Sequence, residues 1–181
     1  MHTAVRLPEG REFGDMRILG IDPGYAIVGF GVIDSVGIKY KPVSGGVITT
    51  PAGIPIEDRL LMIYEKLTAL VKKYKPEAAA VEELFFNTNH TTGIPVAEAR
   101  GVILLCLKQN GIPVYEYTPL QVKQAVVGYG RAEKQQVIAM TTSLLSLSAP
   151  PKPDDAADAL AIAICHANIG GSGLAQFYNK R

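Results

Sequence analysis

The sequence predicts an α/β protein in which a mixed five-stranded sheet carries helices on both faces. Three short apolar segments near the N-terminus are separated by glycine-rich or polar turns, which is typical of a β-meander. After them, segments with apolar residues at helical spacing alternate with two more short apolar segments, in the order helix, strand, helix, strand and three helices. Right-handed crossovers then place the last two strands parallel to the first.

The five strands are expected at residues 17–22, 26–33, 42–49, 78–82 and 112–117. The first ends in Asp22, directly before the turn residues Pro23 and Gly24, and the fourth ends in Glu82. Because these two strands are predicted to be parallel neighbours, Asp22 and Glu82 should lie together at the edge where open α/β sheets bind ligands.

Helices are expected at residues 55–74, 95–109, 119–127 and 132–145, with a final helix that starts in the acidic segment near residue 154. Pro95 stands where the second helix should be under way, so that helix is expected to begin late. Residues 102–107 of this helix are apolar on every side, which predicts a packing partner beyond the sheet, and another subunit is one candidate. Thr118 and Gln121 match a capping box at the start of the third helix.

Length and composition suit one soluble domain. The 181 residues include 48% apolar and 19% charged residues, and we expect a domain over residues 16–168, a disordered extension over 1–15 and a flexible tail over 169–181. Neither a membrane-spanning run nor a signal-peptide pattern is present, so the cytoplasm is the expected location, with no membrane partner. The net charge of +1 neither suggests nor excludes a nucleic-acid partner. Cys106 and Cys165 lie in apolar helical patterns and read as core residues.

The final helix contains an unusual carboxylate. From Ala156 to Cys165 the only polar side chain is that of Asp158, so this helix is expected to be buried nearly all round. Asp155 and Asp158 fall on one stripe at helical spacing. A buried carboxylate without a partner is costly, so a Lys, an Arg or a metal ion should lie opposite these two.

Four acids therefore sit where short apolar elements begin or end: Asp22, Glu82, Asp155 and Asp158. Carboxylates crowded into one cleft raise one another's pKa unless a cation is present, and all-oxygen ligands favour Mg²⁺ or Mn²⁺. Several carboxylates with two hard ions are used for in-line phosphoryl displacement. Taken singly, Asp22 could be a turn residue, Glu82 half of a solvated pair with Glu83, and Asp155 a helix cap; the set of four favours a site.

Six motifs resemble the RuvC family of Holliday junction resolvases, the crossover junction endodeoxyribonucleases. They are Ile21-Asp-Pro-Gly24, Val81-Glu-Glu-Leu-Phe85, Ala99-Arg-Gly-Val102, Gln121-Val-Lys-Gln124, Val127-Gly-Tyr-Gly-Arg-Ala-Glu-Lys134 and Asp155-Ala-Ala-Asp-Ala-Leu-Ala161. The resemblance covers residues 16–166, with the motifs in family order. It implies an RNase H-like fold and a homodimeric, Mg²⁺-dependent endonuclease, with two ions per active site and Mn²⁺ as a substitute. Such an enzyme nicks two opposing strands of a four-way DNA junction symmetrically, in homologous recombination and DNA repair, alongside a RuvA–RuvB branch-migration complex.

The resemblance also implies roles for single residues. The four acids match the family's catalytic, metal-binding carboxylates, Phe85 matches an aromatic residue placed against bases at the junction, and Lys123 and Lys134 match lysines near the DNA. Arg131 flanks the same segment and is a candidate phosphate contact, although a solvated loop charge explains it equally well.

Three other functions fit parts of the pattern. An ATP-handling protein of the actin and sugar-kinase type also places an Asp and glycines after its first strand, but it needs a duplicated domain that 181 residues do not hold. A junction-binding module with vestigial acids, and a related nuclease acting on RNA or another branched DNA, are the other two.

Overall fold

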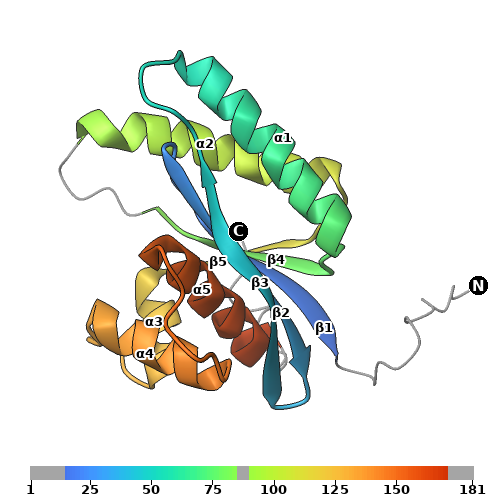
Figure 1. The fold of residues 1–181 in the computed structure, drawn as a ribbon, viewed down its shortest axis with the longest axis vertical. Helices are drawn as coiled ribbons and strands as arrows, with labels where there is room; N and C mark the ends of the chain where they lie inside the picture. Colours follow the sequence, from blue (N-terminus) through green and yellow to red (C-terminus); the bar gives the residue numbers. More distant parts are fainter. Residues whose placement is uncertain (1–14, 85–89, 171–181) are drawn as a thin grey trace, which may run out of the picture.

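The computed structural model describes residues 15–84 and 90–170, which form a five-stranded sheet with helices on both faces (Figure 1). The strands are β1 (Met16–Asp22), β2 (Ile27–Val36), β3 (Lys39–Thr49), β4 (Ala78–Glu82) and β5 (Val114–Tyr117). Their order across the sheet is β3-β2-β1-β4-β5. Strands β1, β2 and β3 pair antiparallel, whereas β4 is parallel to both β1 and β5. The predicted mixed sheet is confirmed.

Two groups of helices cover the two faces. Helices α1 (Ile56–Tyr74) and α2 (His90–Gln109) lie on one face, and α3 (Pro119–Val127), α4 (Lys134–Leu144) and α5 (Asp154–Gly170) lie on the other (Figure 1). Each face has its own apolar core, one centred on Ile63, Leu67 and Ile103 and the other on Leu160 and Ile162. Within the described residues, none of the helices has the length and apolar character needed to cross a membrane.

Helix α3 begins where local capping predicts, whereas helix α2 does not. Thr118 caps α3 as predicted: its hydroxyl accepts from the Gln121 amide at 3.2 Å, and the Gln121 side chain accepts from the Thr118 amide at 2.7 Å. Helix α2, in contrast, begins at His90 and contains Pro95, so the predicted late start was wrong. A proline at this depth removes only one backbone bond, and the burial of Ala99 and Ile103 further along the helix outweighs that loss.

Helix α5 lies directly on β1 and β2 because glycines leave room for its backbone. Gly20 pairs with Gly31 across the two strands. A Cβ atom added to Gly20 would lie 2.0 Å from the Ala159 carbonyl oxygen, and one added to Gly29 would lie 2.1 Å from the Asp155 carbonyl oxygen. The helix is consequently buried from residue 156 to residue 166 except at Asp158, as its composition predicted.

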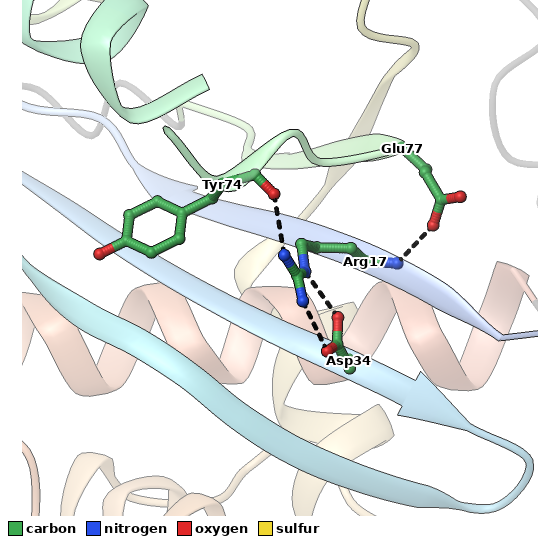
Figure 2. A network of polar contacts seen from close by, with 4 residues as sticks. All are labelled: Arg17, Asp34, Tyr74 and Glu77. Atoms are coloured by element: carbon green, nitrogen blue, oxygen red, sulfur yellow. Dashed lines mark hydrogen bonds and ion pairs between the residues drawn. The ribbon is translucent and has the colours of Figure 1, made fainter. Parts of the chain in front are cut away.

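A polar network fastens the end of the sheet that lies away from Asp22 (Figure 2). The Arg17 guanidinium donates to both carboxylate oxygens of Asp34, at 2.7 and 2.8 Å, and to the Tyr74 carbonyl at 3.1 Å. The Arg17 amide donates to Glu77 at 2.8 Å. One side chain therefore joins β1, β2 and the end of α1.

The two proposed flanking segments mostly fall outside the described residues. Of the expected disordered extension, the structure describes Asp15 alone, and of the expected tail it describes residues 169 and 170.

Candidate active site

The structure brings the four predicted carboxylates to one edge of the sheet. Strands β1 and β4 are parallel with Ile21 opposite Val81, so Asp22 and Glu82, the next residues, end neighbouring strands on the same side. A Cβ atom on Gly29 would meet both the Asp155 carbonyl and the Asp22 Cβ, at 3.2 Å from the latter, which places the Asp22 side chain on the α5 face. Because α5 packs closely against the sheet, its first turns lie beside the ends of these strands.

Burial and mutual repulsion make this cluster unfavourable when fully ionised. Burial, followed by the charges of Glu82, Asp158 and Asp155, raises the pKa of Asp22 to about 7. Burial and the Asp158 charge likewise raise the pKa of Glu82 to about 7. Burial also raises the pKa of Asp158, against the opposing effect of Lys134. The cluster is therefore most stable with bound protons or a bound cation.

Two lysines face these carboxylates across a cleft of about 270 Å³. Glu82, Lys123, Lys134 and Asp158 line it, together with apolar residues of α3, α4 and α5. The Lys134 ammonium lies 3.0 Å from Asp158 and 3.5 Å from Asp154. Burial acts to lower the pKa of Lys134, but the hydrogen bond and charge of Asp158 outweigh it, and the pKa is raised. Lys134 is thus the positively charged partner that the sequence analysis expected opposite Asp158.

Of the remaining predicted site residues, the structure describes Arg131 alone. Arg131 is exposed in the segment between α3 and α4 and is not part of the cleft lining. Phe85, which was predicted to lie against DNA bases, is outside the described residues, so this role stays a prediction.

The chemistry of the cluster fits a hard divalent cation. Its ligands are oxygen atoms of carboxylates only, which suit Mg²⁺ or Mn²⁺ rather than Zn²⁺. A divalent ion would also relieve the repulsion that raises the pKa values of Asp22 and Glu82. In the described residues no three His, Cys, Asp or Glu side chains are already gathered as metal ligands.

The sequence analysis did not predict a buried hydrogen bond that lies next to Glu82. Tyr117 pairs with Glu82 across β5 and β4, and its hydroxyl lies 2.7 Å from Nδ1 of His166. His166 is 2% exposed and packs on the Tyr115 ring with centroids 4.4 Å apart. The position of His166 on the last turns of an otherwise apolar helix was the available sequence signal.

The family model and the curated relatives give the same family. The family model "Crossover junction endodeoxyribonuclease RuvC" matches residues 18–166. A curated relative of this description from Desulfitobacterium hafniense is 60% identical over 153 residues, which cover 84% of this chain and 93% of that protein. Another, from Clostridioides difficile, is 58% identical over 166 residues, covering 86% and 98%. These matches set aside the ATP-handling interpretation.

Solved structures agree with the sequence comparison. The structure of Thermus thermophilus RuvC is 38% identical and superposes with a TM-score of 0.82 over 88% of this chain and 98% of that one. The same protein in complex with a Holliday junction substrate gives 38% identity and a TM-score of 0.83 over 88% and 97%. The predicted RNase H-like fold is thereby confirmed. With the family model spanning most of the described residues and relatives this similar along nearly their whole length, the chain belongs to the RuvC family of crossover junction endodeoxyribonucleases.

Proposed function

We propose that this protein resolves four-way DNA junctions by symmetric, metal-dependent hydrolysis of two opposing strands, in homologous recombination and DNA repair. The observation that carries the proposal is the convergence of four carboxylates at one edge of the sheet, where burial and mutual repulsion raise the pKa values of Asp22 and Glu82 to about 7. Family membership supports a nuclease that depends on divalent metal, and the Thermus thermophilus relative is known in complex with a Holliday junction.

Within the site, each residue has a role that follows from its position. Asp22, Glu82, Asp155 and Asp158 hold the metal, for which Mg²⁺ is proposed and Mn²⁺ is a substitute. When bound, two such ions supply activation of water and stabilisation of the leaving oxygen. The charges of all three other acids act on Asp22, which supports a central place for it among the residues that would hold the metal. Lys123 and Lys134 line the same cleft and are proposed to contact phosphates, so that they position the strand to be cut.

Two more residues are proposed to contact DNA. Arg131 is exposed beside α4 and can reach a phosphate. Phe85 follows the end of β4 by three residues, and an aromatic ring there would stack on unpaired bases at the junction.

Symmetric cutting requires two active sites, and we propose a homodimer. Helix α2 presents Ile94 (65% exposed), Gly101 and Leu105 (54% exposed) along one stripe with seven- and four-residue spacing. An exposed apolar stripe on a helix favours packing against another chain. Action in the cytoplasm beside a RuvA–RuvB branch-migration complex is proposed from the family alone.

The test uses a labelled synthetic four-way junction, with a linear duplex and an RNA–DNA hybrid as comparison substrates, and Mg²⁺ either present or chelated. Asp22→Asn should abolish cleavage and leave junction binding largely intact. Glu65→Gln, which changes an exposed acid of α1 away from the sheet edge, is the matched control and should cut normally.

Each alternative gives its own result. Paired symmetric nicks in the junction alone, lost with chelator and in Asp22→Asn, would support resolution. Binding without cutting across several metals would favour a non-catalytic junction-binding module. Cleavage of the hybrid as well as the junction would favour a nuclease with a different substrate, in the same fold.

A further inference from the structure

Helix α1 buries a charged residue where its pattern calls for an apolar one. The residues that α1 buries against the sheet follow one another at intervals of four: Arg59, Ile63, Leu67 and Val71. Arg59 is only 8% exposed. A guanidinium also lies unfavourably in the first turns of a helix, where the backbone dipole is positive. Packing therefore does not explain why an arginine occupies this position.

The Arg59 side chain lacks the partners that a buried cation normally has. Its Nε atom is fully buried without a hydrogen-bond partner, and none of the carboxylates in the described residues forms an ion pair with it. Its one specific contact is with the Tyr25 ring, whose centroid lies 5.2 Å from the guanidinium carbon. A cation–π contact orients the guanidinium but supplies no acceptor for its N–H groups. Arg59 is thus held in place with its buried Nε–H donor unsatisfied.

The contact partner fixes where this cation lies. Tyr25 comes three residues after Asp22 in the turn between β1 and β2. That turn is fastened to the end of β3, because the Thr50 hydroxyl donates to the Tyr25 carbonyl at 2.7 Å and the Thr50 amide donates to the Ala26 carbonyl at 3.0 Å. Arg59 therefore lies at the same edge of the sheet as the carboxylate cluster.

The two groups are on opposite faces at this edge. Ile63 and Tyr25 belong to the core under α1 and α2, whereas the Asp22 side chain lies on the α5 face. A chain that crosses the edge from the carboxylates toward α1 would reach Arg59. The start of α1 adds further donors, because Pro55 at its N-cap provides no side-chain cap for the first amides.

We propose that Arg59 and the first turn of α1 bind a backbone phosphate of the DNA strand, beside the phosphate that is cut. The inference rests on the proposed function, since it assumes that a DNA strand occupies the cleft. A planar guanidinium with five donors matches a phosphodiester, and its stacking on Tyr25 pre-orders it for that contact. The contact positions the strand; Arg59 takes no part in the chemical step.

The experiment measures junction affinity as a function of salt concentration, in chelator so that nothing is cut. Arg59→Met keeps the length and apolar stem of the side chain and removes its charge. We expect it to weaken junction binding about tenfold at moderate salt and to lower the salt slope by about one counterion. The same variant should be as stable as the wild type or more so, because it no longer buries an unpaired charge. Arg59→Lys should recover only part of the affinity, since it lacks the planar fork.

Lys72→Gln is the matched control, because it removes one exposed charge from the far end of the same helix. An unchanged salt slope together with a lower melting temperature in Arg59→Met would overturn the inference, since Arg59 would then be only structural. A fall in affinity equal to that of Lys72→Gln would overturn it as well. If wild-type protein does not prefer the junction to linear duplex, the proposed function fails separately. The Arg59 comparison is then read on the duplex, where a lost phosphate contact lowers the slope by the same amount.

Discussion

The ammonium of Lys134 lies 3.0 Å from the carboxylate of Asp158, so a residue at the start of α4 compensates a charge within α5. A divalent ion at the cluster must share Asp158 with this ammonium or displace it. Lys134→Gln should therefore lower the Mg²⁺ concentration at half-maximal cleavage by about two- to fivefold, the range expected for a partly exposed pair. The maximal rate should fall, because a proposed phosphate contact is lost.

Rates measured over a Mg²⁺ titration check this prediction. Lys108→Gln removes an exposed lysine at the end of α2 and should change neither quantity. A half-maximal Mg²⁺ concentration that stays the same in Lys134→Gln would show that the ammonium does not compete with the metal.

Gly29 offers a test of how the position of α5 determines activity. A Cβ atom at this residue would lie 2.1 Å from the Asp155 carbonyl oxygen, closer than any real contact, so the start of α5 must move. Gly29→Ala should lower the free energy of unfolding by about 3 kcal/mol and reduce cleavage in the fraction that remains folded. Chemical denaturation and cleavage assays on the same preparation measure the two effects.

Gly101→Ala is the control for stability alone, because Gly101 belongs to the proposed dimer stripe; within the single chain an added Cβ there meets nothing within 4 Å. In the helix α2 this change should leave stability unchanged or raise it by about 0.5–1 kcal/mol. Normal activity in Gly29→Ala would mean that α5 tolerates displacement without separating the carboxylates.

Strand order and the placement of acids at strand ends could be predicted from the sequence because both depend on local patterns. The parallel pairing of β1 with β4 follows from chain order and crossover handedness, and it brings Asp22 beside Glu82. The start of α2 could not be predicted in this way, because Pro95 is locally a boundary signal and only the packing of the whole helix overrides it.

Contacts between distant segments were also beyond the sequence. In α1 the structure buries Arg59 and leaves its apolar neighbour Leu60 half-buried. A turn of 100° per residue makes neighbouring positions on a helix hard to tell apart at the edge of the buried stripe, so the sequence alone favours the apolar residue. The pairing of Lys134 with Asp154 and Asp158 likewise depends on how α4 sits on α5.

Asp22→Asn should also stabilise the folded protein at alkaline pH, because it removes one of the charges that repel one another in the carboxylate cluster. The pKa of Asp22 is raised from 3.8 to about 7 in the folded protein, so above pH 7 the wild type carries a charge that folding disfavours. The variant should then be more stable than the wild type by about 3 kcal/mol at pH 8 in chelator. As the pH falls below 7, the folded wild type takes up the proton and the difference should shrink.

Thermal or chemical unfolding at pH 5, 6, 7 and 8 measures this difference, and saturating Mg²⁺ should reverse it, because only the wild type keeps the full ligand set. A difference that does not vary with pH would contradict the raised pKa. Glu65→Gln, which changes an exposed acid of α1, is the control for these unfolding measurements.

The Arg17 network should contribute to stability but not to catalysis. Arg17→Met removes three hydrogen bonds from its guanidinium, two of them to the Asp34 carboxylate. The free energy of unfolding should fall by about 1–2 kcal/mol, because the pair is partly exposed. Cleavage per folded molecule should be unchanged, since Arg17 lies at the end of β1 opposite Asp22. The control Lys39→Met, at an exposed position of β3, should change neither the free energy of unfolding nor the cleavage per folded molecule. Reduced cleavage without lost stability in Arg17→Met would contradict the prediction, because the network would then contribute to catalysis.

His166 should make the protein less stable in mild acid. Burial lowers its pKa from 6.5 to about 4, so the folded protein keeps the imidazole neutral where the unfolded chain already binds a proton. The contribution of His166 is complete above about pH 6.5 and is lost as the pH falls toward 4, by roughly 3 kcal/mol at most. Asp22 and Glu82 act in the opposite direction over part of this range, so only the difference between variants isolates the histidine.

Unfolding of His166→Gln between pH 4 and 7.5 therefore provides the test. Its stability should decline less steeply in acid than that of the wild type. Tyr117→Phe removes the hydroxyl that lies 2.7 Å from Nδ1 but keeps the buried imidazole. It should be less stable by about 1 kcal/mol at neutral pH and should retain the wild-type decline. If His166→Gln and the wild type decline in parallel, the buried imidazole is not the group that senses acid, and the carboxylate cluster must dominate the pH dependence.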